Sequence, residues 1–241
     1  MALDARPANA RCDPAEAEQP VRLSAPAPGL DLFFFALARS PGELAAMSTL
    51  LAPAEHARAA RFGRPALRDR YIAGRAMLRR LLGERLAMPP ESIQIRRGHR
   101  GRPQVEPATA LDFNVSHTGG YALIGIASSG RIGVDIEHEG RTLNVDGVAR
   151  KFMAPGEHAM LATLTLDQRR RTLLRLWTCK EAMSKATGDA LSAPFRHIEI
   201  ALDGHARVLG GPTPYVPHDW TLHAIRTPGD HLAAIALWKG S

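Results

Sequence analysis

The sequence predicts an α+β protein built from two comparable subdomains. Segments with helical spacing and segments with strand alternation occur in both halves of the chain, which divide near residues 128–131. The 241 residues are 45% hydrophobic and 23% charged, which is typical of a soluble globular protein with room for a large core. We therefore predict one subdomain over residues 29–130 and another over residues 131–241.

The first 28 residues differ in composition from the rest of the chain. They are rich in alanine and proline, and they carry acids where a signal peptide needs an apolar core. We predict a disordered tail there. No apolar run approaches the roughly 20 residues of a membrane span, and the two cysteines, Cys12 and Cys179, form no disulfide framework. These features indicate a cytoplasmic protein with no membrane partner.

The first subdomain is expected to mix strands and helices. Apolar runs and alternation predict its strands, and apolar residues at helical spacing predict its helices. The expected order is a strand over residues 32–38, helices over 41–61 and 65–87, a short strand over 92–97, a Gly/Pro loop over 98–103, and two strands within 111–127 joined by a turn at 118–120.

The second subdomain begins with a strand and ends in strands. Three helices are expected between them, over residues 145–152, 155–164 and 167–187. Gly188 is the expected C-cap of the last helix. The remaining strands are expected within residues 195–202, 220–226 and 231–238.

The strand at residues 131–140, "RIGVDIEHEG", carries two acids on one face. Asp135 and Glu137 alternate with apolar residues, so their Cα atoms are roughly 7 Å apart at about 3.3 Å per residue. Like charges this close repel unless a cation lies between them. A solvated strand face is the simpler interpretation, and a metal site is the alternative.

The helix over residues 167–187 offers a third acid. Leu173, Trp177, Glu181 and Lys185 recur every four residues and therefore share one helix face. A Glu–Lys pair at this spacing is usually a surface helix stabiliser. An acid aligned with a tryptophan also predicts a carboxylate facing a cleft, with a lysine one turn further on.

Groups that suit an anion are spread through the first subdomain. Ser116 and His117 end a predicted strand before a Gly-rich turn, and arginines such as Arg58 and Arg102 lie in helices and loops. The net charge of +7 also indicates an anionic partner. A nucleic-acid-binding module would interleave aromatics with its basic residues, yet aromatics make up only 5% of the chain. We therefore expect no nucleic-acid partner.

Together these groups predict Mg²⁺-assisted chemistry on a phosphate or pyrophosphate substrate. Magnesium is held by a few carboxylates and completes its shell with water and substrate phosphate oxygens. The histidines and cysteines show no zinc-ligand spacing. Both a group transferase and a Mg²⁺-dependent hydrolase of a nucleotide pyrophosphate would use such a site.

Several motifs occur together. "GVDIE" is followed 44 residues later by "WTCKEAMSKATG" and preceded by "FNVSHT" and "GRP". With these motifs, the chain between Pro53 and Phe195 resembles the surfactin-synthetase-type 4'-phosphopantetheinyl transferases. The resemblance implies two similar α+β subdomains related by a pseudo-twofold axis, with coenzyme A at their interface. The implied reaction moves the phosphopantetheine arm of coenzyme A to a serine of an apo acyl or peptidyl carrier protein and releases 3',5'-ADP.

The resemblance also implies roles for individual residues. Asp135, Glu137 and Glu181 correspond to ligands of Mg²⁺, Glu181 also to the base that takes the serine proton, and Lys185 to a group acting on the phosphate. The residues that correspond to the coenzyme A site are Arg58, Arg102, Pro103, Ser116, His117 and Lys185. Glu55 stands where some relatives have a basic residue.

An acidic carrier protein is the partner that the resemblance implies, and we expect the enzyme itself to be a monomer. Carriers would dock on the second subdomain beside the metal site, where basic residues neighbour apolar ones. The basic residues are Arg150, Lys151, Arg169, Arg170, Arg171 and Arg175, and the apolar residues are Phe152, Met153, Met160 and Leu164. A solvated helix start is the simpler interpretation of the arginine run at residues 169–171.

Overall fold

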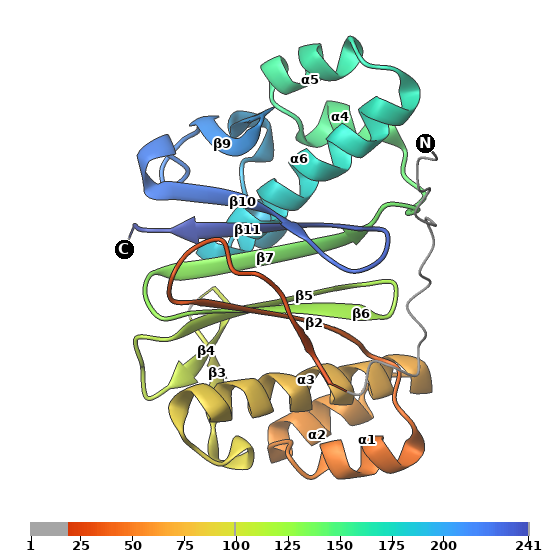
Figure 1. The fold of residues 1–241 in the computed structure, drawn as a ribbon, viewed down its shortest axis with the longest axis vertical. Coiled ribbons are helices and arrows are strands. Elements are labelled where there is room, and N and C mark those ends of the chain that lie inside the picture. Colours follow the sequence, from red (N-terminus) through yellow and green to blue (C-terminus); the bar gives the residue numbers. More distant parts are fainter. Residues whose placement is uncertain (1–18, 99, 241) are drawn as a thin grey trace, which may run out of the picture.

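The computed structural model describes residues 19–98 and 100–240 of the chain. Its strands cross the middle of the molecule and its helices cover the two ends (Figure 1). One end holds helices α1 (Pro41–Ser48), α2 (Pro53–Ala60) and α3 (Pro65–Leu86). The other end holds α4 (Val145–Phe152), α5 (Pro155–Ala162) and α6 (Leu166–Thr187). Among these described helices, none is both long and apolar enough to cross a membrane.

The strands form two main antiparallel sheets. The first sheet has the order β1-β2-β6-β5 and is formed by β1 (Val21–Arg22), β2 (Leu30–Ala36), β5 (Asp112–Thr118) and β6 (Tyr121–Ala127). The second has the order β10-β11-β7 and is formed by β7 (Arg131–His138), β10 (Trp220–Arg226) and β11 (His231–Trp238). Two hairpins complete the strands, β3 (Gln94–Arg97) with β4 (Pro103–Glu106) and β8 (Glu199–Asp203) with β9 (His205–Gly210). Short 3₁₀ turns lie at Pro90–Ser92, Ala190–Ser192, Phe195–His197 and Pro217–Asp219.

The two halves repeat one order of elements. In each half a strand is followed by three helices, a two-stranded hairpin and two further strands. In each half the strand before the helices pairs with the last strand, as β2 pairs with β6 and β7 with β11. This arrangement confirms the predicted α+β fold of two similar subdomains.

A buried ion pair repeats at the same place in both halves. The sequence Ala-Pro-x-Glu starts α2 and α5, and in each helix the glutamate caps the first turn. Glu55 of α2 contacts Arg79 of α3, and Glu157 of α5 contacts Lys180 of α6, both at 2.6 Å. Each pair ties the middle helix of its half to the long one.

Each half has its own apolar core, and a third core joins them. The joining core lies between the sheets and is formed by buried residues of β2, β6, β7 and β11. Leu32, Leu123, Val134 and Ile235 are among its fully buried members. Apolar burial stabilises at about 25 cal/mol per Å², so this core holds the two sheets together.

The structure corrects the sequence predictions in three places. The helix predicted over residues 41–61 is two helices, because Leu51 and Ala52 leave the helix before Pro53 starts the next one. Residues 1–18 of the predicted tail lie outside the described residues, but Val21–Arg22 at its end pair with β2. Strands β4 and β9 were not predicted.

Candidate functional site

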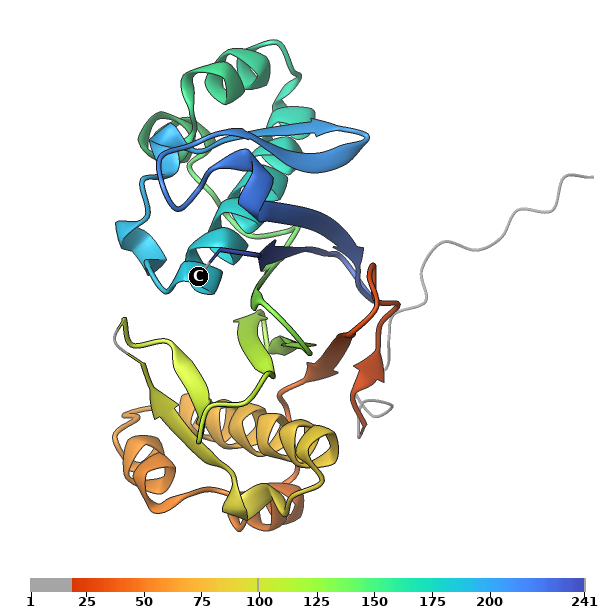
Figure 2. The ribbon, with the colours of Figure 1, turned by 90° about the vertical axis from the view of Figure 1, so that its left-hand side faces the viewer.

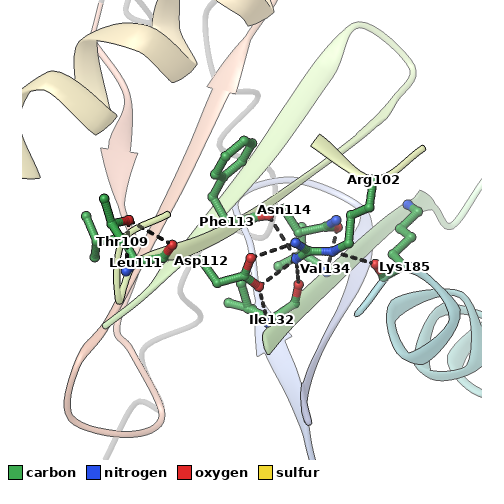
Figure 3. Close-up of polar contacts among 9 residues, drawn as sticks. All are labelled: Arg102, Thr109, Leu111, Asp112, Phe113, Asn114, Ile132, Val134 and Lys185. Carbon is green, nitrogen blue, oxygen red and sulfur yellow. Dashed lines mark hydrogen bonds and ion pairs between the residues drawn. The ribbon is translucent and has the colours of Figure 1, made fainter. Parts of the chain in front are cut away.

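The two halves meet where an edge strand of each sheet lies beside the other. Strands β5 and β7 belong to different sheets, and alternate side chains of β5 supply hydrogen-bond partners for the backbone of β7 (Figure 3). The three bonds run from Ile132 N–H to Asp112 at 2.7 Å, from Val134 N–H to Asn114 at 3.0 Å and from Ile136 N–H to Ser116 at 3.4 Å. We call these three side chains the β5 ladder. The ladder satisfies backbone groups that an edge strand leaves unpaired.

Gly133 lets helix α6 lie directly on strand β7. A Cβ atom at residue 133 would fall 1.8 Å from the carbonyl oxygen of Ala182, well inside contact distance. Only glycine permits this approach of helix and strand. The approach brings the helix face that carries Glu181 and Lys185 to the strand face that carries Asp135.

Asp135, Ser116 and Lys185 form the centre of the site. The Lys185 ammonium donates to Asp135 Oδ1 at 2.6 Å and to the Ser116 hydroxyl at 2.8 Å. The Ser116 hydroxyl donates in turn to Asp135 Oδ1 at 2.8 Å. Asp135 is buried, and its second oxygen, Oδ2, is a buried acceptor without a hydrogen-bond partner among the described residues. Lys185 therefore contacts Asp135 within the second half and Ser116 across the joint between the halves, rather than acting only as a surface partner of Glu181.

Glu137 and Glu181 lie half-buried on either side of this centre. Burial and the nearby charge of Asp135 raise the pKa of Glu137, although its ion pair with Arg141 and its hydrogen bond to Thr118 work in the opposite direction. Burial and the Asp135 charge also raise the pKa of Glu181, against the attraction of Lys185. The three acids predicted to act together therefore repel one another across strand β7 and helix α6.

The donor set suits a hard divalent cation. Asp135 Oδ2 is a free buried acceptor, and mutual repulsion of the three acids is what a bound cation would relieve. Over residues 19–98 and 100–240, however, no three acidic, histidine or cysteine side chains are gathered into a group that could hold a metal ion. A cation here would need further oxygens from water or substrate, as Mg²⁺ commonly takes.

The repulsion predicts an unusual effect of neutralising Glu181. Because the folded-state pKa of Glu181 is raised, its ionisation destabilises the fold as the pH rises from about 4.5 through that pKa. We expect Glu181→Gln to raise the melting temperature at pH 7 without metal, and the gain to vanish at acidic pH. We also expect Mg²⁺ to stabilise the parent more than the variant. Thermal unfolding at both pH values, with and without Mg²⁺, measures this, and a lower melting temperature for Glu181→Gln at pH 7 would contradict it.

Of the residues predicted to bind coenzyme A, some are exposed, whereas others already use their polar groups in hydrogen bonds within the protein. Arg58 and His117 are exposed, and the Arg58 guanidinium lies 5.7 Å from the centre of the Tyr71 ring. Pro103, in the same half, begins β4 and is half-buried. Arg102 is occupied, because its three nitrogens donate to Asp112 and to backbone carbonyls. The Ser116 hydroxyl likewise already forms hydrogen bonds, with Asp135, Lys185 and the Ile136 N–H.

Glu55 has a structural role. It is buried, accepts hydrogen bonds from Arg75 and Arg79, and caps helix α2 through Ala52 N–H. The arginine attraction and these bonds lower its pKa despite its burial. The acid at residue 55 therefore stabilises the packing of α2 on α3.

The sequence analysis missed Asp112 and Asn114, which hold the joint beside the site. Their signal was present, since Asp112, Asn114 and Ser116 alternate along one strand and therefore share one face. The partner strand of that face could not be identified from the alternation alone.

Comparison with known proteins identifies the chain's relatives. Residues 131–236 match a family model described as the 4'-phosphopantetheinyl transferase superfamily, and residues 38–129 match one described as 4'-phosphopantetheinyl transferase, N-terminal. The chain is 37% identical over 163 residues to 4'-phosphopantetheinyl transferase HetI of Nostoc, covering 66% of this chain and 68% of HetI. It is 35% identical over 151 residues to the putative 4'-phosphopantetheinyl transferase slr0495 of Synechocystis, covering 62% of this chain and 61% of the relative.

A third relative matches over a larger share of both chains but at lower identity. The chain is 26% identical over 171 residues to a 4'-phosphopantetheinyl transferase of Bacillus subtilis, covering 70% of this chain and 75% of the relative. The two family matches lie on either side of residue 130, where the structure passes from β6 to β7. With these matches and this site, the chain belongs to the 4'-phosphopantetheinyl transferase superfamily.

Proposed function

We propose that the protein transfers the 4'-phosphopantetheine arm of coenzyme A to a serine of an apo acyl or peptidyl carrier protein, with Mg²⁺, and releases 3',5'-ADP. The observation that carries the proposal is the contact of Lys185 with Asp135 of its own half and with Ser116 of the other, at the joint between two family-matched halves. In this reaction a bond forms between the serine oxygen and the phosphorus of the arm, and the bond from that phosphorus to 3',5'-ADP breaks. We also propose the surfactin-synthetase type within the superfamily.

Each group of the site receives a role in this proposal. Asp135, Glu137 and Glu181 would contribute oxygens to Mg²⁺, with water or substrate supplying the rest, and the ion when bound offsets the negative charge of the coenzyme's pyrophosphate. Glu181 accepts the proton of the carrier serine, a role that suits a carboxylate with a raised pKa. Lys185 stabilises the charge that develops on the phosphate oxygens. Arg58, Pro103 and His117 would line the coenzyme side.

Intact-mass analysis of a panel of apo carriers tests the proposal. After incubation with the protein, coenzyme A and Mg²⁺, we expect at least one carrier to gain the mass of one phosphopantetheine group. Chelation of the metal should prevent the gain. No mass gain on fatty-acid, polyketide or peptide-synthetase carriers would overturn the proposal.

A Mg²⁺-dependent hydrolase of a nucleotide pyrophosphate would use the same acids with water as the nucleophile. The relatives compared above are all named as transferases, so this alternative is not favoured. Incubation with coenzyme A alone separates the two, because a hydrolase releases 3',5'-ADP without a carrier.

Lys185→Met should lower the turnover of protein that remains folded. Removing a preorganised charge from a reacting phosphate costs about 10²-fold in kcat or more, whereas a purely structural Lys185 would affect only the free energy of unfolding, through its ion pair with the buried Asp135. Steady-state kinetics with urea unfolding measure both quantities. Equal kcat in the variant and the parent would show that the role of Lys185 is purely structural.

The structure revises the surface predicted for carrier docking. Met153 is buried, and Arg169 and Arg170 are half-buried, donating to the carbonyls of Leu161 and Glu139. The exposed members are Arg150, Lys151 and Arg171, near the half-buried Phe152. Leu166, 72% exposed, adds an apolar side chain at the start of α6. We propose that an acidic carrier docks on this smaller set.

Docking steered by charge should depend on salt. Exposed charges are screened over about 8 Å at physiological ionic strength, so the KM for carrier should rise with salt more steeply than the KM for coenzyme A. Arg150→Ser/Lys151→Ser should flatten that rise, because it removes two of the exposed charges. Arg96→Ser/Arg207→Ser removes equal charge from exposed sites elsewhere and is the control. The same salt response in both variants would exclude this surface.

We further propose that the protein acts as a cytoplasmic monomer. One chain supplies residues from both halves to the site, so no second copy is needed to complete it. Cys179 is a buried free thiol, as suits a reducing compartment. Sedimentation equilibrium at working concentration tests the monomer, and cell fractionation tests the compartment.

A further inference from the structure

The end of helix α6 is held by a loop from the other half of the chain. That loop lies between strands β3 and β4, and Arg102 at its end reaches across to α6, β5 and β7 (Figure 3). Figure 2 shows this hairpin extending from the first half toward the second. The contacts of Arg102 therefore connect elements of both halves at one point.

The guanidinium of Arg102 makes five hydrogen bonds. It binds both carboxylate oxygens of Asp112 at 2.6 Å. It also donates to the carbonyl oxygens of Ile132 at 2.7 Å, Phe113 at 3.0 Å and Lys185 at 3.0 Å. Only 8% of the side chain is exposed. Asp112 in turn accepts the Ile132 N–H, so arginine and aspartate together hold both polar groups of that residue on β7.

Two further contacts join the loop to α6. Arg100 forms an ion pair with Asp189, just beyond the helix. Gly188, the predicted C-cap, has a φ of +86°, and a Cβ atom there would lie 3.1 Å from Arg100 Cβ. Glycine at residue 188 therefore serves both the left-handed turn and the close approach of the loop.

These contacts distinguish Arg102 from a ligand-binding arginine. A guanidinium that binds a phosphate must offer unoccupied donors to it, whereas every nitrogen of Arg102 already donates within the protein. Lysine could not replace it, because a single ammonium lacks the fork that spans Asp112 and three carbonyls.

We propose that Arg102 and Asp112 form a positioning pair that fixes the last turn of α6 against the first half of the chain, so that Lys185 meets Asp135. This inference rests on the proposed function. Arg102 holds the backbone carbonyl of Lys185, the residue whose ammonium contacts Asp135 and Ser116. The pair acts on the reaction through Lys185 and does not touch the substrate.

Kinetics of Arg102→Lys and Asp112→Asn test the pair. A misplacement of about 1 Å can cost about a hundredfold in rate, so we expect each variant to lower kcat to that extent with the KM for coenzyme A nearly unchanged. A phosphate-binding Arg102 predicts the opposite: Arg102→Lys would keep its charge and largely its kcat, and Asp112→Asn, which removes no group that touches the phosphate, would leave kcat near that of the parent. Arg96→Lys, which alters an exposed arginine–glutamate pair on the same hairpin, is the control.

A double-mutant cycle separates positioning from general destabilisation. In a Lys185→Met background, Arg102→Lys should lower kcat little further, because the pair acts through Lys185. Full additivity of the two changes would overturn the proposal, as would kcat values for Arg102→Lys that match those of Arg96→Lys.

Thermal unfolding tests the pair without activity. The melting-temperature loss of Arg102→Lys/Asp112→Asn should be close to that of either single variant, because both changes break one interaction. If the parent modifies no carrier, the proposed function fails, and this unfolding cycle alone decides whether the pair exists. Additive losses would overturn it.

Discussion

Asp135→Ala is expected to abolish phosphopantetheine transfer while leaving the fold intact. The change removes the oxygen that receives Lys185 and Ser116 and also the free buried oxygen that would face the metal. Loss of a preorganised charged group costs about 10²–10³-fold, and here one substitution removes two such interactions. Intact-mass assays over long incubations measure the residual rate, and circular dichroism checks the fold.

Matched variants separate the functions of the two Asp135 oxygens. Asp135→Asn keeps an acceptor for Lys185 and Ser116 but loses the charge, so it should be nearly as inactive as alanine. Ser116→Ala removes the hydrogen bonds of the hydroxyl to Asp135, Lys185 and the Ile136 N–H but keeps the contact of Lys185 with Asp135, so it should be milder. Glu181→Ala should be comparably severe to Asp135→Ala and Glu137→Ala milder. Parent-like turnover in Asp135→Ala at ordinary magnesium would refute the assignment of the site.

Lys180→Met is expected to produce the largest loss of stability. Lys180 is fully buried, and its ammonium contacts Glu157 at 2.6 Å and the carbonyls of Phe195 and Ile198 at 2.7 and 2.6 Å. Burial lowers the pKa of Lys180 and raises that of Glu157, against their mutual attraction. Methionine would leave the buried Glu157 without its cation, which typically costs about 3–5 kcal/mol. Urea unfolding at pH 7 measures the change.

Removing the second charge should restore part of that stability. Lys180→Met/Glu157→Gln removes the buried charge and keeps one of the two oxygen acceptors that serve the α5 cap and the Ile200 N–H. We expect it to be more stable than Lys180→Met alone. A loss below about 1 kcal/mol in the single variant, the range of exposed ion pairs, would show that Lys180 is solvated in solution.

Much of the fold could be predicted because local patterns determine its elements. The alternation over residues 220–226 and 231–238 gave the last two strands, and Gly188 ends α6 as predicted. The break between α1 and α2 was missed, although Pro53 signals it. Strand β4 was missed because it has only four residues, so its pairing with β3 determines it more than its own sequence does. Strand β9 was missed although Ala206 and Val208 alternate with exposed residues along it.

The residue types of the site could be predicted from the sequence, but the contacts between those residues could not. The spacing along α6 placed Glu181 and Lys185 on one face, yet it paired Lys185 with Glu181, whereas Lys185 contacts Asp135. The contacts of Arg102 to β5, β7 and α6 join residues that are far apart in the sequence. No sequence pattern indicates such contacts, so the sequence predicted Arg102 as a coenzyme A ligand. The repeated Ala-Pro-x-Glu-His-Ala at residues 52–57 and 154–159 was a long-range signal of duplication that a search for short repeats does not find.

The β5 ladder has a consequence for how the molecule opens. The N–H groups of Ile132, Val134 and Ile136 are held by side chains of the other half, so their protection from hydrogen exchange depends on the joint staying closed. Separation of the halves would release all three amides together while the interior of each half stayed protected. A molecule bound across the joint would slow all three to the same extent. These amides therefore provide a label-free reporter of occupancy, readable before any carrier protein is identified.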